Sequence, residues 1–261
     1  MPEVRYTLEN PHRAIQSILF DGRSRYAAHL KDFVRMAADY ASIPFDASPE
    51  GTEPFWNNHW MHSQDTIDLT GMIQANHPAL YLEVGSGNST KFARRAVNLY
   101  SPKTKIISID PAPRAVIDSL CTEVVREPLE SVNPSAFDSL QPGDILFVDS
   151  SHVCSMNSDV TVVFMDIIPR LKPGVLVHFH DIFWPWEHCP RFDKATIQSW
   201  VTRNYTEQYL LGCYLLAGQR LQVEMPIAFV ANDVELFSIL DPLWDYAPPM
   251  ASASSFWVSV R

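Results

Sequence analysis

The chain has 261 residues, 46% of them hydrophobic, which suits one α/β domain with an N-terminal extension. Its formal net charge of −10 disfavours nucleic acid and anionic membranes as partners, because both need a basic patch and none is visible, so a small or neutral ligand is favoured. The four cysteines are scattered, no apolar run reaches the ~18 residues that a membrane span needs, and the N-terminus has no signal pattern. These features predict a cytoplasmic protein. The sequence leaves open whether it forms a homo-oligomer.

Residues 1–78 differ in character from the rest of the chain. Apolar side chains recur at helical spacing between Tyr26 and Ala37, and a proline-rich stretch follows. We therefore expect residues 1–78 to be a helical and loop extension that forms a lid, and residues 79–261 to be the main domain.

From Leu80 onward, apolar strands alternate with helices. This order predicts a parallel or mostly parallel sheet with helices on both faces, so the expected fold class is α/β, a Rossmann-like sheet of seven strands. Strands are expected near residues 80–84, 105–109, 122–126, 144–149, 174–180, 226–231 and 254–260, and helices over 88–100, 113–120, about 155–170 and about 194–217.

The most informative stretch is Tyr81–Thr90, where an apolar strand ends in Glu-Val-Gly-Ser-Gly and turns into a helix. Its two glycines allow a tight turn and close approach of a ligand. Thr90 replaces the third glycine of a dinucleotide fingerprint, and Glu83 would repel a pyrophosphate, so S-adenosylmethionine fits better than NAD or FAD. The next strand ends in Asp110, whose carboxylate can accept hydrogen bonds from both ribose hydroxyls.

Acid and imidazole side chains follow two further strands. Asp149-Ser-Ser-His152 follows the fourth strand and His180-Asp181 the fifth, and neighbouring parallel strand ends lie about 5 Å apart. The cluster could hold a metal through Asp149, His180 and Asp181, or work without metal, with His180 or His152 as general base. It could also bond only loop backbone. His178 points to the same face as His180 and is expected to be a buried residue that belongs to the core or supports the site residues.

Together, the glycine turn, Ile109-Asp110-Pro111, Asp149-x-x-His152 and His180-Asp181 resemble class I S-adenosylmethionine-dependent methyltransferases, most closely their bacterial small-molecule branch. The resemblance covers about residues 79 to 231 and implies a seven-stranded sheet with one antiparallel edge strand. It also implies that Asp110 holds the ribose and that Asp149 lies near the transferred methyl group. The expected cofactor contacts are Glu83, Gly85, Ser86, Gly87, Ser89, Asp110, Pro111, Glu130, Asp149 and Ser150.

Some relatives in this family bind magnesium or another divalent ion through acidic residues at these two strand ends. Here His180 stands where an acid is usual. Magnesium prefers oxygen ligands, so iron, manganese or no metal at all fits this sequence better than magnesium.

Two aromatic segments, residues 55–60 and 183–186, flank the expected site. They could stack on a flat substrate or enclose the sulfonium, and the second could form a substrate lid. The first could equally be the apolar seam between extension and domain, and Glu207 could be a solvated residue on a helix face. The expected substrate contacts are Trp56, Trp60, Phe183, Trp184 and Glu207.

The expected reaction is methyl transfer to a small-molecule acceptor, with oxygen slightly favoured as the methylated atom. The sequence assigns its chemistry to His180, Asp181 and His152. Two alternatives stay open. One is a non-methylating enzyme on the same fold, by intramolecular alkyl transfer or metal-dependent oxidation, and the other is a non-catalytic scaffold.

Overall fold

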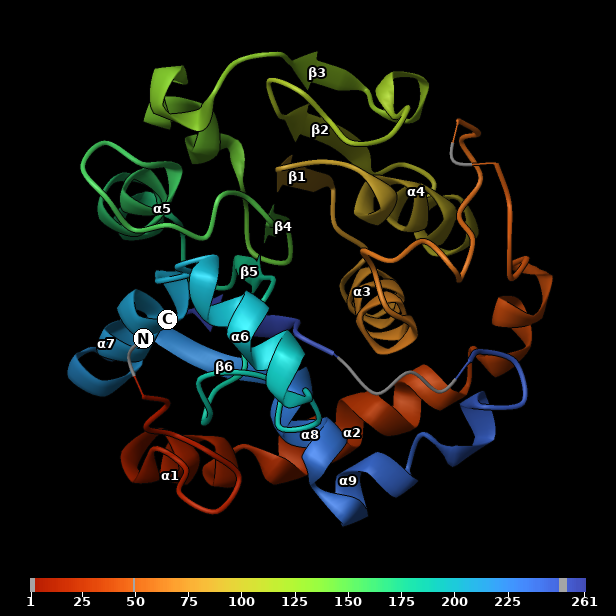
Figure 1. The fold of residues 1–261 in the computed structure, drawn as a ribbon. Helices are drawn as coiled ribbons and strands as arrows, with labels where there is room; N and C mark the ends of the chain where they lie inside the picture. Colours follow the sequence, from red (N-terminus) through yellow and green to blue (C-terminus); the bar gives the residue numbers. More distant parts are fainter. Residues whose placement is uncertain (1–2, 49, 249–252) are drawn as a thin grey trace.

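The computed structural model describes residues 3–48, 50–248 and 253–261. Its centre is a seven-stranded sheet in the order β3-β2-β1-β4-β5-β7-β6 (Figure 1). Strands β1 to β5 pair in parallel, whereas β7 pairs antiparallel with both β5 and β6. The antiparallel strand β7 therefore lies one place inside the edge and not at the edge itself. The strands are β1 (Leu80–Val84), β2 (Lys105–Ile109), β3 (Glu123–Val125), β4 (Ile145–Val148), β5 (Leu176–Phe179), β6 (Leu221–Pro226) and β7 (Phe256–Val260).

Helices cover both faces of the sheet, as the alternating sequence predicts. In Figure 1, α3 and α4 lie on one side of the sheet and α5 and α7 on the other, while α1, α2 and α9 lie below. No helix in the described part of the chain is long and apolar enough to cross a lipid bilayer. The helices are α1 (Arg13–Asp21), α2 (Arg23–Val34), α3 (Ser63–Asn76), α4 (Asn88–Tyr100), α5 (Asp159–Val162), α6 (Lys194–Thr202), α7 (Glu207–Ala217), α8 (Ile227–Asn232) and α9 (Val234–Ser238).

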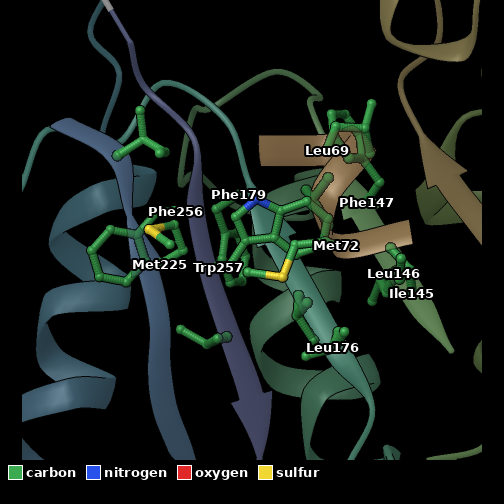
Figure 2. Close-up of a cluster of buried hydrophobic side chains, with 14 of the residues drawn as sticks. Leu69, Met72, Ile145, Leu146, Phe147, Leu176, Phe179, Met225, Phe256 and Trp257 are labelled. Carbon is green, nitrogen blue, oxygen red and sulfur yellow. The ribbon is translucent and has the colours of Figure 1, made fainter. Parts of the chain in front are cut away.

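Strand register decides which side chains face α3. Glu83, Phe147, His178 and Trp257 occupy one row across β1, β4, β5 and β7, so they point to the same face. Phe147 stacks on His178 with ring centroids 3.8 Å apart, and His178 meets the Trp257 ring edge-on at 4.9 Å. Figure 2 shows Trp257 beside Met72 of α3 in this core. His178 Nε2 pairs with the Ser255 hydroxyl at 2.9 Å, which confirms His178 as a core residue.

The opposite face of the sheet packs against α7 and the segment after α5. Phe179 of β5 stacks on Phe164 at 5.2 Å, and Tyr214 of α7 meets Phe164 edge-on at 5.3 Å. Side chains alternate along a strand, so residues two positions apart point to the same face. Asp149 and His180 therefore lie on the α3 side of the sheet, like Phe147 and His178.

The sixth strand was predicted in the wrong place. Most of the segment 226–231 belongs to helix α8 (Ile227–Asn232), and β6 occupies Leu221–Pro226 just before it. The apolar run Ile227–Ala231 is buried throughout, and a run that is apolar on all sides has no period that separates strand from helix. Pro226 ends the strand, since the ring fixes its backbone and removes a donor.

Three predicted helices also differ from the structure. Residues 113–120 contain only a single 3-10 turn at Asp118–Leu120, because the Asp110 carboxylate accepts the Ala112 N–H and bends the chain. The helix expected near 155–170 begins at Asp159 and continues as short π and 3-10 turns. The helix expected over 194–217 breaks into α6 and α7, since the N–H groups of residues 206 and 207 donate to the carbonyl of His152.

Within the N-terminal segment, α2 makes a close contact with α3. A Cβ on Gly71 would lie 2.1 Å from Cδ1 of the fully buried Phe33. We expect Gly71→Ala to lower the free energy of unfolding by about 1–3 kcal/mol, the usual cost of overpacking. Urea denaturation measures it. In a Phe33→Ala background the same change should cost almost nothing, and an equal cost in both backgrounds would contradict this contact.

Candidate active site

A cleft of ≈ 330 Å³ opens at the carboxyl ends of β1, β2 and β4. We call it the first cleft. Parallel sheets bind ligands at the carboxyl ends of their strands, where the chain leaves each strand. Nine of the ten predicted cofactor contacts line the first cleft: Gly85, Ser86, Gly87, Ser89, Asp110, Pro111, Glu130, Asp149 and Ser150.

The two glycines of the turn have different roles. Gly85 has φ +78°, and a Cβ there would lie 1.9 Å from the Asp149 carbonyl oxygen, so this position requires glycine for the fold itself. A Cβ on Gly87 would meet only Arg114 Cβ, at 4.0 Å, and would otherwise enter the open first cleft. The Asp110 carboxylate holds the turn by accepting the Ser86 N–H at 2.7 Å. The turn therefore offers space that an added Cβ would fill, as a cofactor cradle does.

Glu83 supports the turn from beneath and does not line the first cleft, which corrects its predicted role as a cofactor contact. Its side chain is fully buried. Thr90 Oγ1 donates to Glu83 Oε2 at 2.5 Å and accepts the Gly87 N–H at 3.1 Å. Tyr81 donates to the other carboxylate oxygen at 3.3 Å. Thr90, which stands where a dinucleotide fingerprint has its third glycine, thus links the buried acid to the turn.

Burial raises the pKa of Glu83 to about 8, against its ordinary 4.5. The folded protein therefore keeps a proton on Glu83 that the unfolded chain releases, so this residue makes stability fall as pH rises from about 4.5 to about 8. We expect Glu83→Gln to remove that part of the pH dependence, while its amide oxygen can still accept a hydrogen bond from Thr90 or Tyr81. Denaturation of both proteins across this pH range measures it; equal slopes for wild type and variant would contradict the protonated acid.

A second cleft of ≈ 200 Å³ lies beside the first. Trp60, Arg114 and Asp149 line both clefts, so the two meet at these residues. The floor of the second cleft carries the acid and imidazole groups that follow β4 and β5. The structure thus brings together the predicted residues Asp149, His152, His180 and Asp181.

His152 is held between carboxylates on both ring nitrogens. Its Nδ1 lies 2.8 Å from Glu207 Oε2, and its Nε2 lies 3.2 Å from Asp149 Oδ1 and 3.7 Å from Asp181 Oδ2. Burial alone would lower the pKa of His152, but the hydrogen bonds to Asp149 and Glu207 raise it well above its usual range. Carboxylates thus engage both ring nitrogens of His152, which argues against its predicted role as general base.

Glu207 is neither a substrate contact nor a solvated residue. Its side chain is 1% exposed and pairs with His152. The N–H groups of Thr206 and Glu207 both donate to the His152 carbonyl, at 2.8 and 3.0 Å, and so bring the first turn of α7 under the loop after β4. The sequence contains no signal for this contact, because the two residues are far apart in the chain.

His180 faces the same two carboxylates from β5. Its Nδ1 lies 3.6 Å from Asp149 and 3.5 Å from Asp181, too far for strong hydrogen bonds, so this nitrogen has room to accept a proton. Its Nε2 faces the Ser254 hydroxyl at 3.4 Å and Asp65 Oδ2 at 4.0 Å. Burial alone would lower the pKa of His180, but Asp149, Asp181 and Asp65 outweigh it and raise the pKa.

Asp65 of α3 is a site residue that the sequence did not indicate. It is fully buried, and its Oδ1 accepts the N–H groups of Ser254 and Ser255 at 2.9 and 2.8 Å. Helix α3 buries polar side chains over two successive turns, from Ser63 to Thr70. A helix that is polar and yet buried marks a position beside a site or a partner.

The described residues contain no group of three or more His, Cys, Asp or Glu side chains arranged to hold a metal ion. His152 Nε2 already lies 3.2 Å from Asp149 and 3.7 Å from Asp181, the two carboxylates that a metal would need. His180 and His152 together also hold the pKa of Asp149 well below its usual range, although burial alone would raise it. The residues therefore do not fit the predicted metal site at Asp149, His180 and Asp181.

Two of the four aromatic residues predicted to contact the substrate line a cleft, and two do not. Trp60 lines both clefts and Phe183 lines the second. Trp56 is buried against Tyr40 and Phe92, so it belongs to the core seam. Trp184 is buried too. Its Nε1 donates to the Gln208 carbonyl and its ring faces Tyr6 and His12, away from the second cleft, so the substrate roles predicted for Trp56 and Trp184 are wrong.

Residues 82–182 match the family model of a methyltransferase domain. Several solved structures of low identity are similar to the chain. They include the SAH-bound methyltransferase PaMTH1 of Podospora anserina (12% identity, TM-score 0.48, 75% of this chain and 77% of that one) and an O-methyltransferase of Bacillus cereus in complex with SAH (13%, 0.46, 89% and 90%). A third is the O-methyltransferase TomG of Streptomyces achromogenes (15%, 0.42, 74% and 80%). A comparison with curated proteins found no match.

These structural likenesses are too distant to carry an argument, so the assignment depends on the chain itself. The family match covers β1 through the end of β5, which is the part that builds the first cleft. Within it lie the glycine turn, Asp110 and the Asp149 junction. Residues 82–182 are therefore a methyltransferase domain, of the kind that uses S-adenosylmethionine.

Proposed function

We propose that the protein transfers the methyl group of S-adenosylmethionine to a hydroxyl oxygen of a small molecule bound in the second cleft. The observation that carries this proposal is Asp149, which lines both clefts and marks the point where they meet. In-line displacement requires the methyl donor and the acceptor to meet at one such point. The net charge of −10 supports a small-molecule acceptor over nucleic acid or a membrane surface.

When bound, S-adenosylmethionine supplies an electrophilic methyl group whose transfer leaves the electron pair of the broken bond on sulfur. His180 Nδ1 takes the proton of the acceptor hydroxyl, because it is the strand-end nitrogen without a short partner. Ser254 and Asp65 orient the ring from the Nε2 side. The fixed His152 cation keeps Asp149 ionised and in place.

We propose that this chemistry needs no metal ion, since His152 supplies a cation between Asp149 and Asp181. We further propose that the 1–78 segment is a lid, since Trp60 and His62 line the second cleft from just outside α3. We further propose the cytoplasm as its compartment, because reduced thiols such as those of Cys121, Cys154 and Cys213 are typical there.

The experiment is an assay with methyl-labelled S-adenosylmethionine and a panel of small phenols and alcohols, with and without EDTA. We expect labelled methyl ethers, equal amounts of S-adenosylhomocysteine, and the same rate in both conditions. Rate loss in EDTA that a divalent ion restores would overturn the metal-free mechanism. Cofactor consumption without a methylated product would favour alkyl transfer or oxidation instead.

A further inference from the structure

Two guanidinium groups at the second cleft lack a charged partner in a strongly acidic chain. Elsewhere arginines are engaged: Arg23 pairs with Asp233, Arg126 with Asp118 and Arg170 with Asp138. Within the described ranges, no hydrogen bond or ion pair engages the guanidinium of Arg114 or Arg203, and both side chains line the second cleft. They are the feature of this cleft that the methyl-transfer mechanism does not use.

Aromatic rings hold both groups in position. The Arg114 guanidinium lies over the Trp60 ring at 4.5 Å, and that of Arg203 lies over Trp200 at 5.1 Å and Tyr205 at 5.8 Å. Stacking engages the flat face of a guanidinium and leaves its N–H edge free for a planar anion. All three rings line the same cleft. The cleft wall is therefore both aromatic and cationic on the side of α6.

The floor of the cleft has the opposite character. Asp149 and Asp181 lie there, beside His152 and His180. An anionic group would be repelled from the carboxylates at the floor and attracted to the arginines. A ligand with a hydroxyl at one end and an anion at the other thus has only one favourable orientation, with the hydroxyl toward His180.

We propose that the acceptor is an aromatic hydroxy acid whose carboxylate binds Arg203 while its ring lies among Phe183, Trp200 and Tyr205. This inference rests on the proposed function and names its substrate class. The cleft volume of ≈ 200 Å³ suits a molecule of one ring with short substituents. Arg114 also lines the first cleft, where it can meet the cofactor's own carboxylate, so Arg203 is the residue that reports on the acceptor alone.

The test is calorimetric titration of the full chain saturated with S-adenosylhomocysteine. The probes are 4-hydroxybenzoate, 3,4-dihydroxybenzoate and 3,4-dihydroxycinnamate, each paired with its neutral primary amide. We expect each acid that fits to bind roughly 10- to 100-fold tighter than its amide, the usual effect of a hydrogen bond to a charged group. Arg203→Gln should abolish this preference without changing the affinity for the amides, and Arg203→Lys should keep part of it.

Arg35→Gln is the matched control, because Arg35 is an exposed arginine on the N-terminal segment that pairs with Asp32. It should keep the full preference. Equal affinity for acids and amides, a preference that survives Arg203→Gln, or no binding of any acid would each overturn the substrate class. Failure of S-adenosylhomocysteine itself to bind would appear in the first titration and would overturn the proposed function, and this inference with it.

Discussion

Replacing His180 with glutamine is expected to lower the rate of methyl transfer by roughly 100-fold or more, the usual contribution of a positioned general base. Glutamine keeps polar atoms near Ser254 and Asp65 but cannot take a proton. Binding of S-adenosylhomocysteine should stay within about twofold, since His180 does not line the first cleft, so the loss should fall on the chemical step. Single-turnover rates with labelled cofactor measure it.

The pH profile separates a general base from a merely structural histidine. The pKa of His180 is raised above 6.5 by its carboxylate neighbours, so the neutral, proton-accepting form increases only as pH rises past that higher value. The wild-type rate should therefore rise with pH at values above the usual pKa of a histidine, and the residual rate of the variant should not follow that rise. His29→Gln on α2, where His29 faces Glu224, is a control that should change neither. A wild-type profile that the His180 variant retains would contradict the assignment.

Replacing Gly87 with alanine is expected to weaken binding of S-adenosylhomocysteine by about 1–3 kcal/mol, as overpacking by one methyl group does in a close-fitting site. The new Cβ meets no protein atom closer than 4.0 Å, so the folded state has room for it. The variant should therefore melt like the wild type when no ligand is present. Calorimetric titration and thermal unfolding on the same preparation measure the two effects.

Gly85→Ala is the comparison for this prediction. Its Cβ would collide with the Asp149 carbonyl, and alanine is strained at φ +78°, so this variant should lose folding stability together with binding. If Gly87→Ala bound the ligand as tightly as the wild type, the cofactor would not lie against this turn.

Local patterns in the sequence predicted the central part of the fold. The strands at β1, β2 and β4 and the helix α4 appear where apolar runs and the glycine turn place them. The prediction of a strand at 226–231 was wrong because an apolar run that is buried on all sides has no period. The break before Glu207 was not predicted because it is caused by a contact with the carbonyl of His152, which is remote in the chain.

The site also contains some residues that the sequence predicted and others that it did not. Asp149 and His180 were predictable because they follow the carboxyl ends of parallel strands, and these ends lie together on one side of the sheet. Asp65, Glu207 and Arg203 come from helices that pack over that edge, and only the three-dimensional arrangement brings them to it. Glu83 was predicted at the cofactor, since its position at the end of β1 does not show that its side chain points beneath the turn and not into the cleft.

The most direct test of the account is calorimetric titration of the purified wild-type protein with S-adenosylhomocysteine and S-adenosylmethionine, before and after chelator treatment. The cleft at the Gly85–Gly87 turn predicts that both ligands bind at one site per chain with micromolar affinity, unchanged by the chelator. Absence of binding by either ligand would contradict the methyltransferase assignment, and affinity that disappears with the chelator would contradict a site organised by His152 in place of a metal.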